Sequence, residues 1–355
     1  MDCLLISGST DDLSLYSYYQ DWHEGFVNHA NLSVNVIETT NLRAAWKAPL
    51  LKRKYDLIVF LHSTHPTIDG SRKVPILKRL LTGIRGPRVF FLNNEFKAWQ
   101  DKLNLADYLG ARFLISQLNL DDAKFIYEMW PHQILSLPYG LNPQVYQPRI
   151  PMSEREIDVG FRGDYYASYV GHNDRNLLLD EVKDALRERH PKVRVDIAVG
   201  ERYGRDEWAD FLNRCVALIG HEAGMTRVDK DENIRNFINA QEVRLAADKF
   251  RKLVDVMRET GVFNPPPSGR IAAPRNFEAM GTKTLQILLP GRYNDIFEAG
   301  VHYVELQRDL SNLDDVVGTL FDESARDAIV ERAYQDGLAH HTYEQRINQL
   351  VKAIS

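Results

Sequence analysis

Long hydrophobic runs are absent from this chain of 355 residues. The longest apolar stretch, near Leu57–Leu61, is far shorter than the roughly 18–20 residues needed to cross a bilayer. The N-terminus has no basic region ahead of an apolar one, so we do not expect a secretory signal peptide. Together these two absences predict a protein of the cytoplasm.

Cysteine is also scarce, since the chain contains only Cys3 and Cys215. Two cysteines this far apart supply neither a disulfide framework nor a zinc site. No large excess of one charge exists, because 44 Lys and Arg oppose 49 Asp and Glu, for a net charge of −5. With 44% hydrophobic residues, the composition is that of a globular protein long enough for two domains.

Two common phosphate-binding motifs are missing after the first expected strand. That strand is followed by Ser7-Gly8-Ser9-Thr10-Asp11-Asp12. The segment has neither the Gly-x-Gly-x-x-Gly of dinucleotide-binding folds nor the Gly-Lys-Ser/Thr of a P-loop. NAD-dependent enzymes and P-loop kinases are therefore disfavoured.

Short apolar runs alternate with longer amphipathic ones, which is typical of βαβ units and parallel sheets. The expected strands of the first half are Cys3–Ser7, Ser33–Ile37, Asp56–Leu61, Arg88–Leu92, Phe113–Ile115 and Ile134–Leu137. Those of the second half are Ile157–Phe161, Arg194–Val199, Val216–Gly220 and Gln286–Leu289. Because the pattern restarts near residue 157, we predict an α/β protein with two sheets.

The density of proline and glycine suggests where the two halves meet. Proline and glycine gather in 137–151, which favours an interdomain crossing with its boundary near residues 148–155. We therefore predict a first domain over residues 1–150, a second over 151–340 and a closing helix over 341–355. Residues 225–270 interrupt the second series, and we expect one long charged helix there, Gln241–Thr260.

The end of one second-half strand suggests an anion site. In Gly160-Phe161-Arg162-Gly163, flexible backbone and a guanidinium group lie at the carboxyl end of a strand, and a helix begins after Asn173-Asp174-Arg175. Open α/β sheets bind ligands at this end, where helix N-termini and arginines hold phosphate. The alternative is a tight turn with two solvated arginines.

A second motif supports the same interpretation. In Ala273-Pro274-Arg275-Asn276-Phe277-Glu278, proline suits the first turn of a helix, and Arg275 and Glu278 lie three residues apart on one face. A carboxylate there can accept hydrogen bonds from a vicinal diol, while Arg275 meets a phosphate. Ribose plus diphosphate fits this combination. The alternative is a surface ion pair of little energetic weight.

Residues 275–285, which begin within this motif, resemble the Arg-x-Phe-Glu-Ala-Met element of GT-B glycosyltransferases. The resemblance is greatest to the spore-maturation-protein-B group and glycosyltransferase family 4. Three further segments are similar to that family: 294–304 to its Phe-x-x-Gly-x-x-Tyr-Val stretch, 341–346 to its closing His-Thr-Tyr-x-x-Arg, and 139–148 to its interdomain element. Similarity covers roughly residues 134–220 and 271–350. The first domain matches only in its alternating pattern.

The resemblance implies a GT-B fold, with two Rossmann-like domains whose parallel sheets face each other across a cleft. It also implies that the second domain binds a nucleotide-sugar donor carrying UDP, GDP, ADP or dTDP. Glu278 would hold the ribose, and Arg275, Arg162 and Arg175 would neutralise the diphosphate, as a metal-independent enzyme requires. The matched positions add Gly163, Phe277, Thr282 and Lys283 to the donor site, and no cofactor or metal is expected.

Two departures from the family pattern leave the stereochemical outcome open. Lys283 stands where the family usually has glycine, so it either reaches the phosphate or is a tolerated surface residue. Retaining relatives also carry a glutamate eight positions before Glu278, where this chain has Arg270. Glu222, at the end of another strand, is a candidate for the same catalytic task.

The acceptor side requires a group that receives a proton from the acceptor hydroxyl. Two strand ends of the first domain supply candidates: Glu95 as the base, with His62 as the second choice. The alternatives are a helix N-terminal glutamate and a turn histidine with structural roles.

Residues 41–88 are rich in Lys and Arg, and Trp46 lies among them. This stretch fits an anionic partner such as a lipid-linked acceptor at the inner membrane surface, an acidic polysaccharide or nucleic acid. The alternative is two solvated helices that cover the sheet.

We therefore predict a glycosyltransferase that moves a sugar from a nucleotide-diphosphate donor to a hydroxyl of a glycan, a lipid-linked acceptor or a cell-surface polymer. Three alternatives stay open: a glucosyltransferase that modifies nucleic acid bases, a sugar-nucleotide epimerase, and a non-catalytic sugar-nucleotide-binding subunit. The donor base and sugar, the acceptor, the role of residues 225–270 and the oligomeric state are not determined by the sequence.

Overall fold

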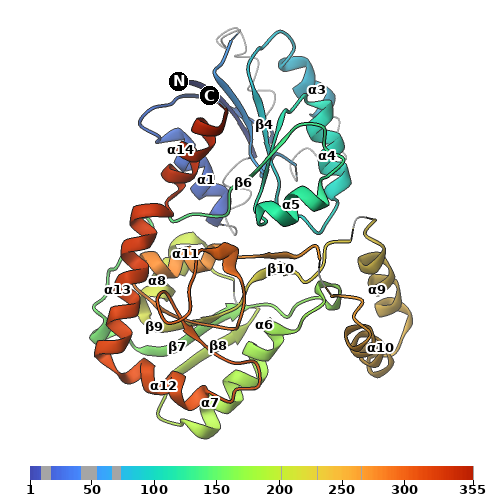
Figure 1. The fold of residues 1–355 in the computed structure, drawn as a ribbon. Helices are drawn as coiled ribbons and strands as arrows, with labels where there is room; N and C mark the ends of the chain where they lie inside the picture. The colour runs from blue at the N-terminus through green and yellow to red at the C-terminus, as the bar shows by residue number, and fades with distance from the viewer. Residues whose placement is uncertain are drawn as a thin grey trace. The chain divides into compact units, whose positions relative to one another are not determined.

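The computed structural model describes residues 1–8, 17–40, 54–65, 73–200, 202–229, 231–264 and 266–354. The chain divides into two compact units (Figure 1). The first unit contains Met1–Pro138 and Tyr343–Ser355, and the second contains Tyr139–Thr342. Each unit is built around its own parallel sheet, so the predicted α/β class is confirmed.

The first unit has a six-stranded parallel sheet in the order β2-β1-β3-β4-β5-β6. Its strands are β1 (Asp2–Ser7), β2 (Ser33–Glu38), β3 (Leu57–Phe60), β4 (Arg88–Phe91), β5 (Phe113–Ser116) and β6 (Gln133–Ser136). All six predicted strands are present. The strand order reverses at β1, because β2 lies on one side of it and β3 on the other. Ligands of open α/β sheets bind at such a reversal.

Helices cover both faces of this sheet (Figure 1). They are α1 (Ser17–Val27), α3 (Lys73–Leu80), α4 (Trp99–Tyr108), α5 (Leu120–Ile126) and α14 (Tyr343–Ile354). Helix α14 packs beside α1, and Tyr343 and Ile347 join Trp22 and Phe26 in the core. The last helix of the chain is therefore part of the first unit.

The second unit has a five-stranded parallel sheet in the order β13-β12-β9-β7-β8. Its strands are β7 (Ile157–Gly163), β8 (Val195–Val199), β9 (Cys215–Gly220), β12 (Leu285–Leu288) and β13 (Val304–Glu305). The four predicted strands are confirmed, and the short β13 is additional. The order again reverses at its first strand, with β8 on one side of β7 and β9 on the other.

Helices also flank the second sheet. They are α6 (Asp174–Leu177), a π-helical turn (Leu178–Val182), α7 (Lys183–Arg189), α8 (Arg205–Arg214), α11 (Pro274–Gly281), α12 (Leu313–Phe321) and α13 (Glu323–His340). Short 3₁₀ turns occupy Met152–Glu154, Ser168–Val170 and Tyr293–Asp295. Of the helices in the described ranges, none combines the length and the apolarity that membrane crossing requires.

The insertion in the second unit leaves the sheet through a two-stranded antiparallel ribbon of β10 (Ala223–Met225) and β11 (Gly269–Ile271). Gly224 has φ +89°, and a Cβ there would lie 1.9 Å from the carbonyl oxygen of Gly269, so only glycine fits. Beyond the ribbon the chain forms α9 (Asn233–Arg244) and α10 (Ala247–Glu259). The prediction of a single helix, Gln241–Thr260, is therefore wrong.

The boundary between the units differs from the predicted one near residues 148–155. Residues from Tyr139 onward belong to the second unit because they pack on its helices. The Leu141 N–H donates to the carbonyl oxygen of His341 at 2.7 Å. A Cβ on Gly281 would lie 2.4 Å from Leu141 and from Tyr146, so this glycine allows the close approach. The density of proline and glycine indicated the region where the chain crosses between the units. The packing of residues from Tyr139 onward determines where the second unit begins.

Candidate functional site

The carboxyl ends of β7 and β9 define the candidate site, because the strand order of the second unit reverses between them. Gly163 ends β7, and His221 and Glu222 follow β9. Arg175 comes from α6 and Arg275 from α11. Four separate segments therefore contribute side chains to one edge of the sheet.

Arg175 is held by neutral groups. Its Nε donates to Nε2 of His221 at 3.3 Å and its Nη1 donates to the Asp164 carbonyl oxygen at 3.3 Å, while the guanidinium lies 3.8 Å from the Tyr166 ring centre. Because Nε2 of His221 accepts, its Nδ1 carries the proton and donates to the Glu222 carbonyl oxygen. Burial keeps the pKa of His221 well below its usual value, so this ring stays neutral.

Arg275 lies in the first turn of α11, behind Pro274. Its Nη1 donates to the Arg162 carbonyl oxygen at 3.0 Å. The guanidinium also lies 5.0 Å from the Phe161 ring centre and 5.7 Å from that of Trp208. Burial, together with the nearby charge of Arg175, lowers the pKa of Arg275 to about 10.

Arg175 and Arg275, hereafter the arginine pair, share an electrostatic property. Within the described ranges, every hydrogen bond that either guanidinium donates goes to a carbonyl oxygen or to neutral His221. No carboxylate of these ranges forms an ion pair with either of them. Two neighbouring positive charges with neutral partners form a binding site for an anion with two negative charges.

Glu278 is buried one turn further along α11, with 4% of its surface exposed. Its Oε2 accepts a hydrogen bond of 2.6 Å from Nε1 of Trp208 on α8. The same indole ring lies beside the Arg275 guanidinium. Trp208 thus contacts both the candidate ribose carboxylate and one member of the arginine pair.

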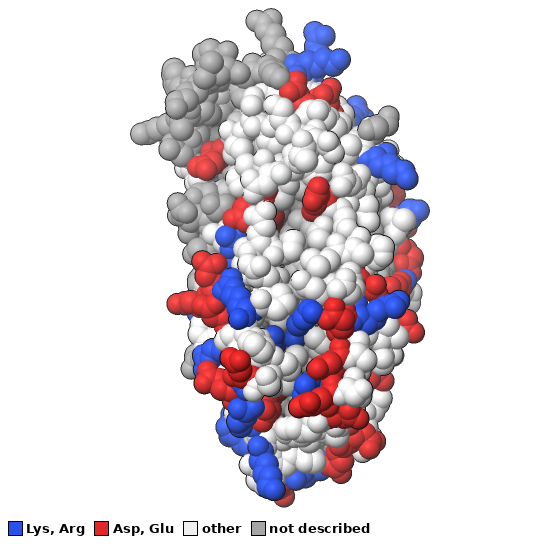
Figure 2. Space-filling view, turned by 90° about the vertical axis from the view of Figure 1, so that its left-hand side faces the viewer, with Lys and Arg blue, Asp and Glu red and all other residues white. Residues whose placement is uncertain are grey.

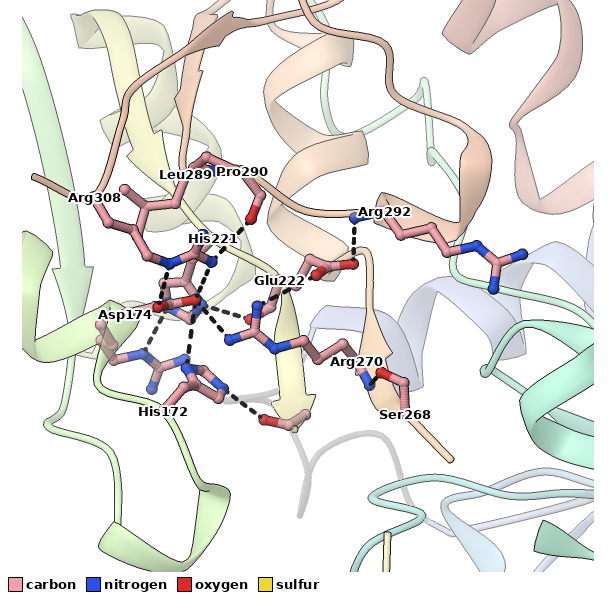
Figure 3. Close-up of polar contacts among 12 residues, drawn as sticks. His172, Asp174, His221, Glu222, Ser268, Arg270, Leu289, Pro290, Arg292 and Arg308 are labelled. Atoms are coloured by element: carbon pink, nitrogen blue, oxygen red, sulfur yellow. Dashed lines mark hydrogen bonds and ion pairs between the residues drawn. The ribbon is translucent and has the colours of Figure 1, made fainter. Parts of the chain in front are cut away.

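Glu222 clamps a turn of the backbone (Figure 3). Its Oε1 accepts from the N–H groups of Arg292 at 3.1 Å and Tyr293 at 2.7 Å, and Nη1 of Arg270 is 3.5 Å from its Oε2. A Cβ on Gly291 would lie 2.7 Å from that Oε2, so glycine allows the approach. Burial raises the pKa of Glu222. These contacts hold loops in place.

Asp174 is the centre of the ion-pair network in Figure 3. Its carboxylate accepts from Nη2 of Arg270 at 2.7 Å and from Nε and Nη2 of Arg308 at 3.1 Å, and Nδ1 of His172 lies 3.5 Å away. Burial alone would raise the pKa of Asp174, but the Arg308 hydrogen bonds and the Arg270 charge hold it well below its usual range. Arg270 is therefore a structural ion-pair partner at the position where retaining relatives have a glutamate.

Arg162 was expected to contact the diphosphate, but its guanidinium points elsewhere. Nη2 forms an ion pair with Asp196 at 2.9 Å, and Nη1 donates to the carbonyl oxygens of Phe161 and Asp196. The guanidinium is also 4.4 Å from the Phe211 ring centre. Because its charge is already neutralised, Arg162 supports the site mainly through the carbonyl oxygen that binds Arg275.

Lys283 lies outside the arginine pair and its surroundings. Its Nζ forms a hydrogen bond and ion pair with Glu331 on α13 at 2.5 Å and lies 4.5 Å from the Tyr334 ring centre. The backbone there has φ +53°, a conformation that glycine adopts more readily than lysine. The Lys283 side chain therefore contacts α13, and its role in donor binding stays a prediction.

Three other residues predicted to bind the sugar-nucleotide donor mainly contact neighbouring parts of the protein. Phe277 is fully buried against Phe297. The Thr282 hydroxyl lies within hydrogen-bonding distance of two α11 carbonyl oxygens. Gly163 lies at the site, where an added Cβ would be 3.2 Å from the Phe161 ring and 3.5 Å from Cδ of Arg175. Only the last of these positions adjoins the arginine pair.

In the first unit, Glu95 is 5% exposed and accepts three hydrogen bonds. These come from the Ser116 hydroxyl at 2.7 Å, the Gln117 N–H at 2.7 Å and the Tyr127 hydroxyl at 2.6 Å. Burial raises the pKa of Glu95 despite these donors. The carboxylate thereby ties the end of β4 to that of β5.

His62 follows β3, next to the reversal of strand order in the first sheet. It is 0% exposed, and no residue of the described ranges forms a hydrogen bond with either ring nitrogen. The rings of Tyr18, Tyr19, Trp22 and Phe91 surround it edge-on. Burial lowers the pKa of His62 to about 3, so the imidazole is neutral at physiological pH.

Two parts of the basic stretch 41–88, residues 41–53 and 66–72, lie outside the described residues, and they contain Arg43, Trp46, Lys47, Lys52, Arg53 and Arg72. Within the described part, Arg88 binds three carbonyl oxygens and Lys78 covers the Tyr108 ring. These two residues have structural roles.

On the face shown in Figure 2, positive and negative side chains are interspersed over α13, with ion pairs such as Arg332–Asp336.

Sequence reasoning missed several residues of the site. His221, which orients Arg175, directly precedes a predicted candidate and shares its strand end, so that position was a usable signal. Trp208 lies within a helix and carries no motif. The ion pairs of Asp174 with Arg270 and Arg308 join positions far apart in the chain. Among the residues described, no group of three or more His, Cys, Asp or Glu is arranged to hold a metal ion.

Comparisons with known proteins give a family and a fold. A family model described as glycosyl transferase-like matches residues 175–352, which is half of the chain. A search of curated proteins found no matching sequence.

Several solved structures are similar over their full length. HepE of Anabaena, in complex with UDP and glucose, superposes with a TM-score of 0.55 at 12% identity, covering 100% of this chain and 99% of that one. A glycosyltransferase from Rickettsia africae gives 0.53 at 10% identity, covering 99% and 98%. Sucrose-phosphate synthase from Thermosynechococcus elongatus gives 0.52 at 10% identity, covering 100% and 99%. At these identities the likeness is one of fold.

Proposed function

The chain belongs to the glycosyl transferase-like family, has the GT-B fold and is a glycosyltransferase, and we propose that its arginine pair binds the diphosphate of a nucleotide-sugar donor. We also assign it to the branch of the spore-maturation-protein-B group and glycosyltransferase family 4. The motifs at 275–280 and 341–346 support that assignment.

The observation that carries the proposal is the lack of a carboxylate partner on Arg175 and Arg275 within the described ranges. Three other arginines lie at the same sheet edge, and each has a carboxylate partner. Arg162 pairs with Asp196, Arg270 pairs with Asp174 and Glu222, and Arg308 pairs with Asp174. A nucleoside diphosphate supplies the negative charges that the arginine pair lacks. Bidentate guanidinium contacts to phosphate are also among the stronger hydrogen bonds in proteins.

Glu278 is proposed to bind the ribose. An ionised carboxylate has about four lone-pair sites, so Glu278 can accept hydrogen bonds from ribose hydroxyls while it holds the Trp208 N–H. It lies on the same helix as Arg275, one turn away. Adjacent turns of α11 therefore supply one residue that binds the diphosphate and one that binds the ribose of the same nucleotide.

During transfer, the bond between the sugar's anomeric carbon and the terminal phosphate oxygen breaks, and the electron pair leaves with the nucleoside diphosphate. The acceptor oxygen bonds to the anomeric carbon and gives its proton to a base. Charge grows on the leaving phosphate, and the arginine pair is preorganised beside it. We therefore propose that leaving-group stabilisation comes from guanidinium groups, and that EDTA leaves the rate unchanged.

His62 is our proposed base in the first unit, in preference to Glu95. Three donors already occupy the Glu95 carboxylate, whereas no described residue forms a hydrogen bond with either ring nitrogen of His62. The imidazole is neutral because burial lowers the pKa of His62 to about 3, and this weakly basic ring acts as the base only where acceptor binding restores its pKa towards the working pH. Glu222 is assigned a positioning role, because its oxygens hold the turn at 292–293.

A thermal-shift panel tests donor binding, with UDP, GDP, ADP and dTDP as ligands. A nucleotide present at about 100 times its dissociation constant should stabilise the wild type by roughly 2.7 kcal/mol. In Arg175→Gln and Arg275→Gln we expect this shift to fall by more than half. Arg214→Gln is the matched control, because that exposed guanidinium is paired with Glu156 outside the site. A panel in which no nucleotide stabilises the wild type, or in which Arg275→Gln responds equally, would overturn the proposal.

A further inference from the structure

A groove of about 700 Å³ lies within the second unit, between the insertion and the segment that leads into α6. One wall comes from the insertion and contains Leu245, Phe250 and Val254. The opposite wall contains Ser168, Asn173 and Asn176. The volume is in the range of small-ligand sites, which are concave and combine apolar surface with a few convergent polar groups.

The two walls differ in chemistry in a way that suits a sugar ring. A pyranose has C–H faces that pack on aromatic and aliphatic side chains, and a rim of hydroxyls that both donate and accept hydrogen bonds. Half-buried Phe250 supplies the first kind of contact. Amide and hydroxyl groups of the opposite wall supply the second, since each donates and accepts. We propose that this groove binds an oligosaccharide.

Charge selects the class of oligosaccharide. The groove is lined by three carboxylates, Asp180, Glu242 and Asp255, against two guanidinium groups, Arg251 and Arg258. Arg258 is paired with Asp255 at 3.2 Å. The remaining negative excess repels acidic polysaccharides and nucleic acid phosphates. The ligand is therefore an uncharged or amino-bearing sugar chain.

The groove is also connected to the donor site through α6. Asn173 and Asn176 line the groove, while Arg175 between them belongs to the arginine pair. Oδ1 of Asn176 accepts from the Tyr166 N–H at 3.0 Å, and the Tyr166 ring carries the Arg175 guanidinium. A sugar chain in the groove would contact the same helical turn that holds the diphosphate arginine. Binding of a sugar chain in the groove does not depend on the donor proposal.

A glycan array probed with the labelled full chain, without donor, tests the proposal. The array carries neutral, amino-substituted and acidic oligosaccharides of two to six units. We expect binding to neutral or amino-substituted chains, and at least a fivefold loss of signal in Phe250→Ala and in Glu242→Gln. Phe237→Ala and Glu259→Gln are matched controls, because neither residue lines the groove. Glu242 and Glu259 both lie in the last turn of their helices, so their loss has the same effect on the helix dipole.

Three outcomes would overturn the groove as an oligosaccharide site. The first is an array that gives no signal with neutral and amino-substituted chains. The second is binding of acidic chains alone, and the third is equal binding by the groove variants and their controls. The nucleotide panel run on the same variants separates this inference from the proposed function. Nucleotide stabilisation without glycan binding refutes the groove alone, and glycan binding without nucleotide stabilisation refutes the donor proposal alone.

Discussion

At the scale of single residues, the partner of an arginine decides its role at this site. Arg162 and Arg275 are held near the same strand end, because Arg162 donates to the Phe161 carbonyl oxygen and Arg275 donates to the Arg162 carbonyl oxygen. Arg162 is neutralised by Asp196, whereas Arg275 keeps its charge beside that of Arg175. Only the second arrangement stores unfavourable electrostatic energy that an anionic ligand can relieve.

Removing the charge of Arg275 should therefore stabilise the ligand-free protein. Its pKa is lowered to about 10 in the fold against about 12.5 unfolded, so the folded state binds this proton less tightly. The charge of Arg275 therefore lowers the free energy of unfolding. This effect is fully present below pH 10 and disappears as the pH rises towards 12.5. At pH 8 we expect Arg275→Gln to raise the free energy of unfolding by about 1 kcal/mol, after a discount for partial exposure. Urea denaturation at pH 8 measures it, and a variant less stable than wild type would contradict the argument.

Trp208→Phe separates the ribose contact from the phosphate contact. The change keeps an aromatic ring but removes the N–H that holds Glu278. We expect the dissociation constant for a stabilising nucleotide to rise about fivefold to tenfold, which is roughly the 1 kcal/mol of one hydrogen bond. The affinity for inorganic pyrophosphate should stay within twofold. Isothermal titration calorimetry measures both.

Trp130→Phe is the matched control for that measurement. Trp130 belongs to the first unit, and its buried indole N–H has no hydrogen-bond partner among the described residues, so its removal should leave nucleotide affinity unchanged. Equal losses of nucleotide and pyrophosphate affinity in Trp208→Phe would contradict a ribose role for Glu278.

At the scale of elements, the insertion shows how tertiary contacts interrupt a helix that the sequence alone would continue. Residues 241–260 contain neither proline nor any glycine, so no residue there signals a break. Leu245 and Ala246 nevertheless have extended backbone, with ψ of 148° and 149°. Leu245 contributes to the groove wall together with Phe250. Packing at this corner overrides the high helix propensity of leucine and alanine.

Proline at position 246 distinguishes a broken helix from a continuous one. Ala246 has φ −63°, and the extended Leu245 before it is the conformation that proline requires of its predecessor. Ala246→Pro should therefore stabilise the protein by about 0.4–1 kcal/mol. Ala240→Pro, inside α9, should destabilise it by about 3 kcal/mol. Thermal unfolding compares the two, and similar losses in both variants would mean that the helix runs through residue 246.

At the scale of the whole molecule, the chain contributes its last helix to its first unit. Tyr343, Ile347 and Leu350 of α14 complete the core that β1 and α1 begin. Gly25 on α1 makes room for this helix, because an added Cβ would lie 3.1 Å from Tyr343 and 3.2 Å from Ile347. The first unit is therefore complete only when the chain's final residues are in place.

Ile347→Ala tests the weight of this contact. Ile347 is 0% exposed, and truncation of such a side chain costs about 2–5 kcal/mol through lost burial and the remaining cavity. We expect urea denaturation of the first unit to shift by that amount, while the nucleotide response of the second unit persists. Lys352→Ala, on an exposed position of the same helix, should change stability by less than about 0.5 kcal/mol. Equal effects of the two changes would contradict the placement of α14.

The sequence by itself determined the alternation of strands and helices, the two sheets, and the positions of Arg175, Arg275 and Glu278 at strand and helix ends. These features are local, since they follow from hydrophobic period, turn residues and helix-start chemistry. Only the tertiary structure decided which arginines keep their charge, because Asp196 neutralises Arg162 and Asp174 neutralises Arg270 across distances that no sequence pattern encodes. It also decided the break between α9 and α10 and the return of α14, since both depend on packing between segments far apart in the chain.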